Sequence, residues 1–222
     1  MCWNAEVSLN TFAFSTFVLG MIMYNNTYTQ YKITHLNDIY VYLLFCSVIS
    51  MQLVEFFIWR NIDNKYYNRI FSLVAAILLL LQPFFSIMTT SDIYIRNIVL
   101  IGYIFLAVPY FIYQYSYRQY VHYSVVSKSG HLQWDIIDIN KKGYLQIFHW
   151  SIWLFFFLFS FVYNQHLIGF LFLVIILGIV VYNYFQDNSI GSMWCWLANS
   201  VSIYYAVYLL IYLPFCDKKT IC

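Results

Sequence analysis

Charged residues are scarce in this sequence. Only 9% of the 222 residues are Asp, Glu, Lys or Arg, and the formal net charge at pH 7 is +2. A nucleic-acid-binding domain presents clustered basic residues to the phosphate groups. With so small a net charge and no basic stripe, the sequence offers no support for a nucleic-acid partner.

Glycine is scarce as well, with 7 residues in the whole chain and no clear pair four positions apart. Small residues at that spacing let membrane helices approach each other closely. Aromatic residues, in contrast, make up 23% of the chain. We therefore expect aromatic packing between the helices in place of close glycine contacts.

Apolar residues dominate the composition. They form 63% of the chain, and the mean hydropathy is +0.68. A membrane-spanning helix needs about 20 mainly apolar residues, and the backbone inside lipid must satisfy its own hydrogen bonds, which leaves helices or a closed barrel. The apolar runs are continuous and do not alternate with polar residues. We therefore predict an all-α membrane protein whose first partner is the lipid bilayer.

Seven segments are apolar and long enough to be predicted as spanning helices of a single transmembrane domain over residues 1–222. They are residues 7–24, 39–59, 70–88, 93–113, 144–163, 167–185 and 193–214. Arg96 and Asn97 fall at the start of the fourth segment and must reach the membrane interface. The sequence thus predicts a seven-transmembrane helix bundle, and a count of six stays open.

The connection between the fourth and fifth segments, residues 118–142, is the only sizeable predicted extramembrane piece. Residues 120–126 and 131–136 resemble two short strands on either side of the turn Ser127-Lys128-Ser129-Gly130. We expect a small extramembrane β-hairpin here. An ordinary polar linker with interfacial tyrosines is the alternative.

Polar side chains inside the predicted spans gather near the N-terminal face of the bundle. Within one helix they recur three, four or seven positions apart and so share a face. Polar groups in a bilayer normally face the bundle interior or a wet cavity. We predict a polar, aromatic-lined cavity formed by Glu6, Asn10, Gln52, Glu55, Trp59, Gln114, His149, Trp153, Asn183, Trp196 and Asn199.

Glu55 lies inside its span, where a carboxyl is either held neutral or paired. Arg60, Arg118 or His149 could supply the partner, so a structural ion pair is the alternative to a role in a site. His149 is a lone intramembrane histidine with no other ligand-type residues at metal spacing. We expect no metal, no cofactor and no catalytic site, and therefore not an enzyme; a thiol reaction at Cys195 is the alternative that stays open.

Two further features concern cysteine and proline. Cys2 and Cys195 lie on one predicted face, each beside a tryptophan, and are the candidate disulfide if that side is oxidising. In the third span, Gln82 precedes Pro83. Proline has no N–H to donate, so the carbonyl of Leu79 is freed, and we expect a kink there with a carbonyl open to a polar contact.

Five short motifs, MCWNAEVS, QLVEFFIW, LLQP, GHLQW and GSMWCWLAN, together resemble an uncharacterised family of multi-pass membrane proteins of giant DNA viruses. The resemblance implies a seven-helix viral protein of a host or virion membrane, and it implies no activity.

The residues themselves favour a protein that binds or transports a small polar solute or a proton through the cavity, with Glu55 as the central group. The alternative is a receptor-like or scaffold membrane protein. It would bind a protein partner through the hairpin around Trp134 and the aromatic mouth of the cavity.

Overall fold

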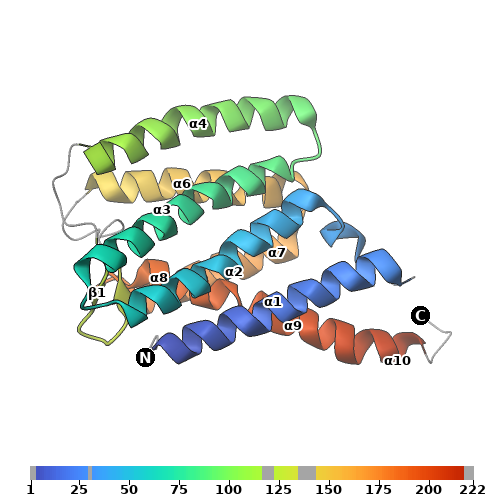
Figure 1. Cartoon of the computed structure of the whole chain (residues 1–222). Coiled ribbons are helices and arrows are strands. Elements are labelled where there is room, and N and C mark those ends of the chain that lie inside the picture. The colour runs from blue at the N-terminus through green and yellow to red at the C-terminus, as the bar shows by residue number, and fades with distance from the viewer. Residues whose placement is uncertain (1–3, 30–31, 117–122, 135–143, 218–222) are drawn as a thin grey trace.

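The computed structural model describes residues 4–29, 32–116, 123–134 and 144–217, apart from the side chains of residues 114–116, 144–146 and 216–217. The described chain is mostly helical (Figure 1). Its elements are α1 (Ala5–Tyr28), η1 (Thr34–Leu36), α2 (Ile39–Arg60), α3 (Lys65–Met88), α4 (Ile93–Ser116), β1 (Val125–Val126), β2 (Leu132–Gln133), α6 (Tyr144–Tyr163), α7 (Leu167–Tyr184), α8 (Ile190–Ala198), α9 (Val201–Val207), the π-helix η3 (Tyr208–Tyr212) and α10 (Leu213–Asp217).

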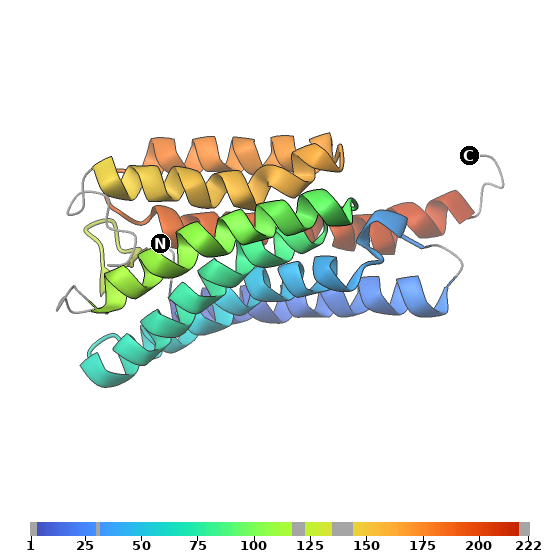
Figure 2. The same cartoon turned by 90° about the horizontal axis from the view of Figure 1, so that it is seen from above.

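The long helices run side by side in one bundle. Helix α2 packs between α1 and α3, and α6 packs against α3 and α7. Helix α8 contacts both α2 and α7, and α9 lies along α1. Figure 2 shows that α1 and the last helical run extend past the ends of α4, α6 and α7. At one end of the bundle, α1 and the C-terminal helices therefore project furthest, with η1 and the start of α2 packed against them.

Six helices are long and apolar enough to cross a membrane, by length and composition. They are α1, α2, α3, the part of α4 that ends at Tyr113, α7, and the run Ile190–Phe215. Helix α6 contributes a shorter apolar stretch, Ile147–Tyr163. Large apolar and aromatic side chains also point away from the bundle, with Ile168 exposed by 87% and Phe105 by 76%. Such a surface is compatible with a multi-pass membrane protein and costly in water.

Side-chain caps explain where two of the helices begin. Helix α2 begins at Ile39, as predicted, because the Asp38 carboxylate accepts hydrogen bonds from the first backbone N–H groups of the helix. Helix α3 begins at Lys65 and not at residue 70. The Asn64 side chain accepts from the N–H groups of Tyr66 and Tyr67 at 3.2 and 3.3 Å, so the polar first turn is helical as well.

The last predicted span, residues 193–214, lies within the apolar run Ile190–Phe215, although this run is not one continuous α-helix. The α-helix is interrupted at Asn199 and Ser200. The Asn199 amide donates to the carbonyl of Cys195 at 2.8 Å, and the Ser200 hydroxyl donates to the carbonyl of Leu197. These side chains compete with the backbone for the helix carbonyls, which breaks the regular pattern.

The predicted hairpin is present. Strands β1 and β2 pair antiparallel, with Val125 opposite Gln133 and Val126 opposite Leu132. Gly130 closes the turn with a φ of +82°, a conformation that glycine adopts without strain. The two-stranded sheet therefore forms where the sequence placed its turn.

Candidate functional site

A buried carboxyl where α2 meets α8 is the main candidate site. Glu55 is only 2% exposed, and its Oε2 accepts a hydrogen bond of 3.1 Å from Nε2 of Gln52. On α8, the Ser192 hydroxyl and the Cys195 thiol lie close enough to interact with this carboxyl. We call these four buried side chains the Glu55 cluster.

The neighbours of Glu55 are neutral. No lysine, arginine or histidine is among the groups that interact with it in the described residues. The predicted ion pair with Arg60 or His149 is therefore not formed, and Arg118 lies outside the description. Arg60 is exposed at the end of α2, while the His149 ring stacks on Tyr110 at a centroid distance of 3.5 Å. Burying a carboxylate with no counter-ion costs several kcal/mol, so this site disfavours a negative charge.

Glu55 also has unused hydrogen-bonding capacity. Its second oxygen, Oε1, is buried and meets no hydrogen-bond partner in good geometry among the described residues, although Ser192 lies nearby. The same holds for Oε1 of Gln52. Native proteins pair most of their buried polar atoms, so two unpaired acceptors in one cluster suggest a ligand or a proton that the cluster exchanges.

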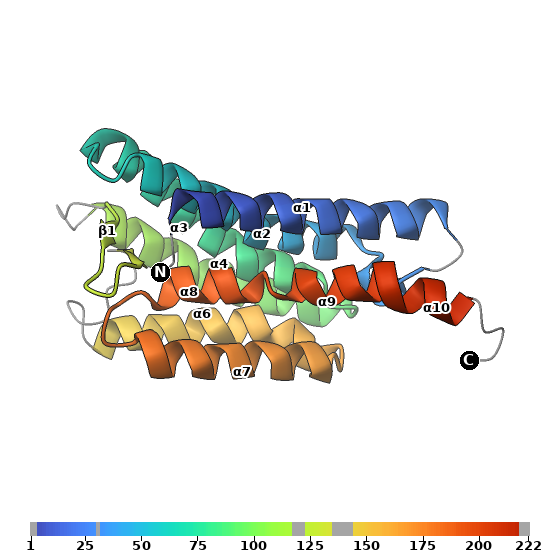
Figure 3. The same cartoon turned by 90° about the horizontal axis from the view of Figure 1, so that it is seen from below.

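The hairpin closes the cluster from the end of the bundle. Leu132 is fully buried and Trp134 is 4% exposed, and both belong to the apolar core that also contains Met51, Trp194 and Cys195. Strand β2 packs directly on α8, and Figure 3 shows the hairpin at the end where α8 begins. Packed apolar side chains of the described residues thus surround the Glu55 cluster.

Hydrogen bonds fix the start of the hairpin to α3. The side chain of Asn68 bonds to both backbone groups of Ser124: Nδ2 donates to the carbonyl at 3.0 Å, and Oδ1 accepts from the N–H at 2.8 Å. The hydroxyls of Ser72 and Ser124 lie 2.9 Å apart. All three residues are at most 5% exposed. The hairpin is therefore an integral part of the bundle.

Several residues predicted to line the cavity lie elsewhere. Glu6 and Asn10 are exposed on α1. Asn183 is exposed on α7, and its amide donates to the carbonyl of Ile179 in its own helix at 2.8 Å. The side chain of Gln114 lies outside the described residues. Residue spacing identified side chains that share a helix face, but it did not reveal which way that face turns.

The predicted tryptophans have structural roles. Trp59 and Trp196 are half-buried and pack against the main apolar core. The indole N–H of Trp153 donates to the carbonyl of Leu79 at 2.7 Å. This is the carbonyl that Pro83 frees, so the tryptophan supplies the polar contact that the sequence left open. Asn199 is buried, and its Oδ1 meets no hydrogen-bond partner in the described chain.

Cys195 is a free thiol in a fully packed position, 1% exposed. The candidate disulfide with Cys2 is therefore not formed in this structure, and Cys2 itself lies outside the described residues. The thiol instead contributes to the surroundings of Glu55.

No protein-family model, curated protein or solved structure matches the chain.

A second buried polar region surrounds Pro83 in α3. The hydroxyl of Tyr103, on α4, donates to the carbonyl of Leu80 at 2.6 Å, beside the contact between Trp153 and Leu79. Gln82 is 1% exposed, and neither atom of its amide has a hydrogen-bond partner in the part of the chain that the structure describes. Side chains from α4 and α6 thus hold the proline turn of α3, while Gln82 retains unused capacity.

The sequence reading missed the polar stripe along α3. Its buried members recur at helical spacing, and three of them bond to the start of the hairpin or to α6. They are Asn68, Ser72, Gln82 and Ser86. Ser86, for example, donates to the carbonyl of Phe157 at 2.6 Å. The signal was present as small and polar residues repeating every four or seven positions within an apolar helix.

Proposed function

We propose that the chain is a multi-pass membrane protein in which seven segments cross the bilayer. The six long apolar helices and the outward-facing apolar side chains support this proposal. Helix α6 packs against α3 and α7, which are both long enough to span, and so we count it as the remaining segment. The resemblance to giant-virus membrane proteins assigns the bilayer to a host or virion membrane, and this stays a prediction.

We propose further that the Glu55 cluster binds a proton or a small polar solute during transport across this membrane. The observation that carries the proposal is a buried carboxyl whose interacting groups among the described residues are all neutral, and whose Oε1 has no hydrogen-bond partner in good geometry there although the Ser192 hydroxyl lies nearby. Ionisable side chains inside membrane proteins are costly and commonly mark proton or substrate pathways. A buried carboxyl with no counter-ion favours its neutral, protonated form, and in this proposal it releases the proton when water reaches the cluster.

The packing of the hairpin favours transport over the receptor-like alternative. A partner-binding hairpin would present its aromatic side chain to the outside, but Trp134 is 4% exposed and packs with the core. The same packing covers the Glu55 cluster. Access from that side therefore requires the hairpin to move away from α8, and the hairpin acts as a cover for the site.

Proton flux into sealed vesicles tests the proposal. Purified protein is reconstituted into liposomes that contain a pH-sensitive dye, and a potassium diffusion potential drives proton entry. The test variant is Glu55→Gln, which keeps the side-chain size and removes the titrating group. Its matched control is Glu6→Gln, because Glu6 is an exposed residue of α1 outside the cluster.

We expect the wild type and Glu6→Gln to acidify the vesicles faster than empty liposomes do, and Glu55→Gln to match the empty liposomes. Infrared spectroscopy of the folded protein supplies a second readout, since a protonated carboxyl has a distinct carbonyl band that Glu55→Gln would lose. Equal flux in the wild type and Glu55→Gln would refute the role of this carboxyl. Absence of wild-type flux would refute proton transport.

A further inference from the structure

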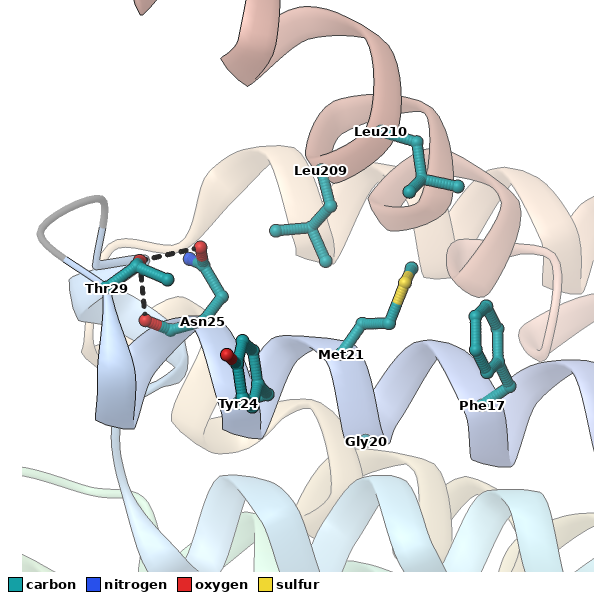
Figure 4. A pocket seen from close by; sticks show the side chains of 8 residues that line it. All are labelled: Phe17, Gly20, Met21, Tyr24, Asn25, Thr29, Leu209 and Leu210. Atoms are coloured by element: carbon teal, nitrogen blue, oxygen red, sulfur yellow. Dashed lines mark hydrogen bonds between the residues drawn. The ribbon is translucent and has the colours of Figure 1, made fainter.

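A groove with a volume of about 440 Å³ lies between the second half of α1 and the π-helix η3. Phe17, Met21 and Tyr24 form one wall, and Leu209 and Leu210 form the other (Figure 4). The groove belongs to the end of the bundle opposite the hairpin, where α1 and the last helices extend past their neighbours (Figure 2). It shares no lining residue with the Glu55 cluster.

Two local features create this groove. Gly20 lies on its α1 wall, and a Cβ atom added there would meet no atom within 4 Å. On the other wall, the chain forms a π-helix over Tyr208–Tyr212. Segments of π-helix are rare and frequently occur at functional sites. Because Gly20 has no side chain, space is left opposite the π-helical turn that carries Leu209 and Leu210.

The groove has one polar end. Asn25 and Thr29 line it there, and the Thr29 hydroxyl lies 2.8 Å from both the carbonyl and the side-chain Oδ1 of Asn25. Helix α1 ends at Tyr28, so this polar pair marks the helix terminus. The groove therefore suits an amphiphilic ligand. Its apolar walls fit a long apolar chain, and its polar end fits the polar linkage at the head of that chain.

We propose that the groove binds one acyl chain of a bilayer phospholipid, with the ester linkage beside Asn25 and Thr29. The proposal rests on the membrane placement proposed above, because both walls then lie within spanning segments. Phe17 and Leu210 are 61% and 59% exposed, so the groove opens sideways into lipid. Its volume falls within the range of about 300–1,000 Å³ that is typical of small-molecule sites. An acyl chain that enters the groove from the bilayer gives up no contact with water, because it was surrounded by lipid before.

Photo-crosslinking tests this site. The protein is reconstituted in vesicles of phosphatidylcholine that carry a diazirine in the middle of one acyl chain, and the labelled peptides are mapped after illumination. The Gly20→Leu variant fills the groove from within. The matched control is Gly178→Leu on α7, since a Cβ atom at Gly178 also meets nothing within 4 Å and the residue lies outside the groove.

We expect the wild type and Gly178→Leu to be labelled most strongly in the peptides that contain residues 17–24 and 208–212. In Gly20→Leu this labelling should fall to the level of the other lipid-facing helices. Labelling that is equal in Gly20→Leu and the wild type would overturn the site. So would groove peptides that stay unlabelled by the lipid while a photoreactive amino acid introduced at Leu210 crosslinks two chains, because a second copy would then occupy the groove.

The outcome also separates this proposal from the membrane placement. If no helix is labelled by the lipid, the placement itself has failed. If the helices are labelled evenly and the groove peptides are not enriched, the placement stands and the acyl-chain site has failed.

Discussion

A double-mutant cycle between Pro83 and Trp153 tests how α3 is held at its proline. The carbonyl of Leu79 has no helix partner at position 83, and the indole N–H of Trp153 donates to it at 2.7 Å. Trp153→Phe removes this donor. The remaining ring can still stack on Phe157, with which the indole lies nearly parallel at 5.0 Å. The change therefore isolates the hydrogen bond better than Trp153→Ala would.

The expected loss of stability can be bounded by the costs of losing such a hydrogen bond in soluble proteins and between membrane helices. Leaving a buried carbonyl unpaired costs about 1–3 kcal/mol in soluble proteins, whereas hydrogen bonds between membrane helices average about 0.6 kcal/mol with a maximum near 1.7. We expect Trp153→Phe to lower the free energy of unfolding by about 1–2 kcal/mol when Pro83 is present. In the Pro83→Ala background the alanine N–H bonds to Leu79, so the cost should shrink by about 1 kcal/mol.

The assay is reversible unfolding in mixed micelles, followed by circular dichroism as the fraction of denaturing detergent rises. Trp59→Phe serves as the control, because Trp59 packs on the core from α2 and should lose the same stability in both backgrounds. A coupling free energy near zero between Trp153→Phe and Pro83→Ala would refute the reasoning.

Two further predictions concern the hairpin. Asn68→Ala removes the side chain that bonds both backbone groups of Ser124, so we expect the hairpin to dock about 1–3 kcal/mol less tightly. Faster amide hydrogen exchange in the hairpin would measure this loss. The control Ser129→Ala, in the exposed turn, should change the exchange rates little. Burial lowers the pKa of His131, so its neutral form favours docking. Docking should therefore be strongest above pH about 6.5 and weaken as the pH falls below it, because the undocked histidine binds the proton more readily. Exchange rates measured across this range check the sign, and a dependence that persists in His131→Phe would contradict the assignment.

Most of the helices could be predicted from the sequence because they are long and apolar, and the side chains of Asn4, Asp38 and Asn64 cap three of them. The hairpin was equally readable, since Gly130 marks a turn between two short apolar runs. The position of the hairpin within the bundle could not be predicted from the sequence. An extramembrane loop is expected to face water, yet Leu132 and Trp134 complete the core beside α8. That placement depends on contacts between segments far apart in the chain.

The candidate site could be predicted only in part. Gln52 and Glu55 were identified correctly as buried polar residues, because their spacing places them on one face of α2. Asn10 and Asn183 followed the same logic and are exposed. In a helix that is apolar on every side, there is little contrast between a face turned inward and one turned outward. The groove at Gly20 could not be foreseen at all, since its second wall comes from the π-helix near the C-terminus.

The separation of Glu55 from Ser192 and Cys195 along the chain has a consequence for biogenesis. Synthesis proceeds from the N-terminus, so α2 exists well before α8 is made. Until then Gln52 is the only member of the Glu55 cluster beside the carboxyl. The four core residues that α8 supplies have not yet been made, so Trp134 of the hairpin lacks these packing partners. On the membrane placement proposed above, the early chain is thus an intermediate whose acidic group α8 does not yet cover. Packing of α8 then covers this group, so the proposed proton site is complete only after the last helices have joined the bundle.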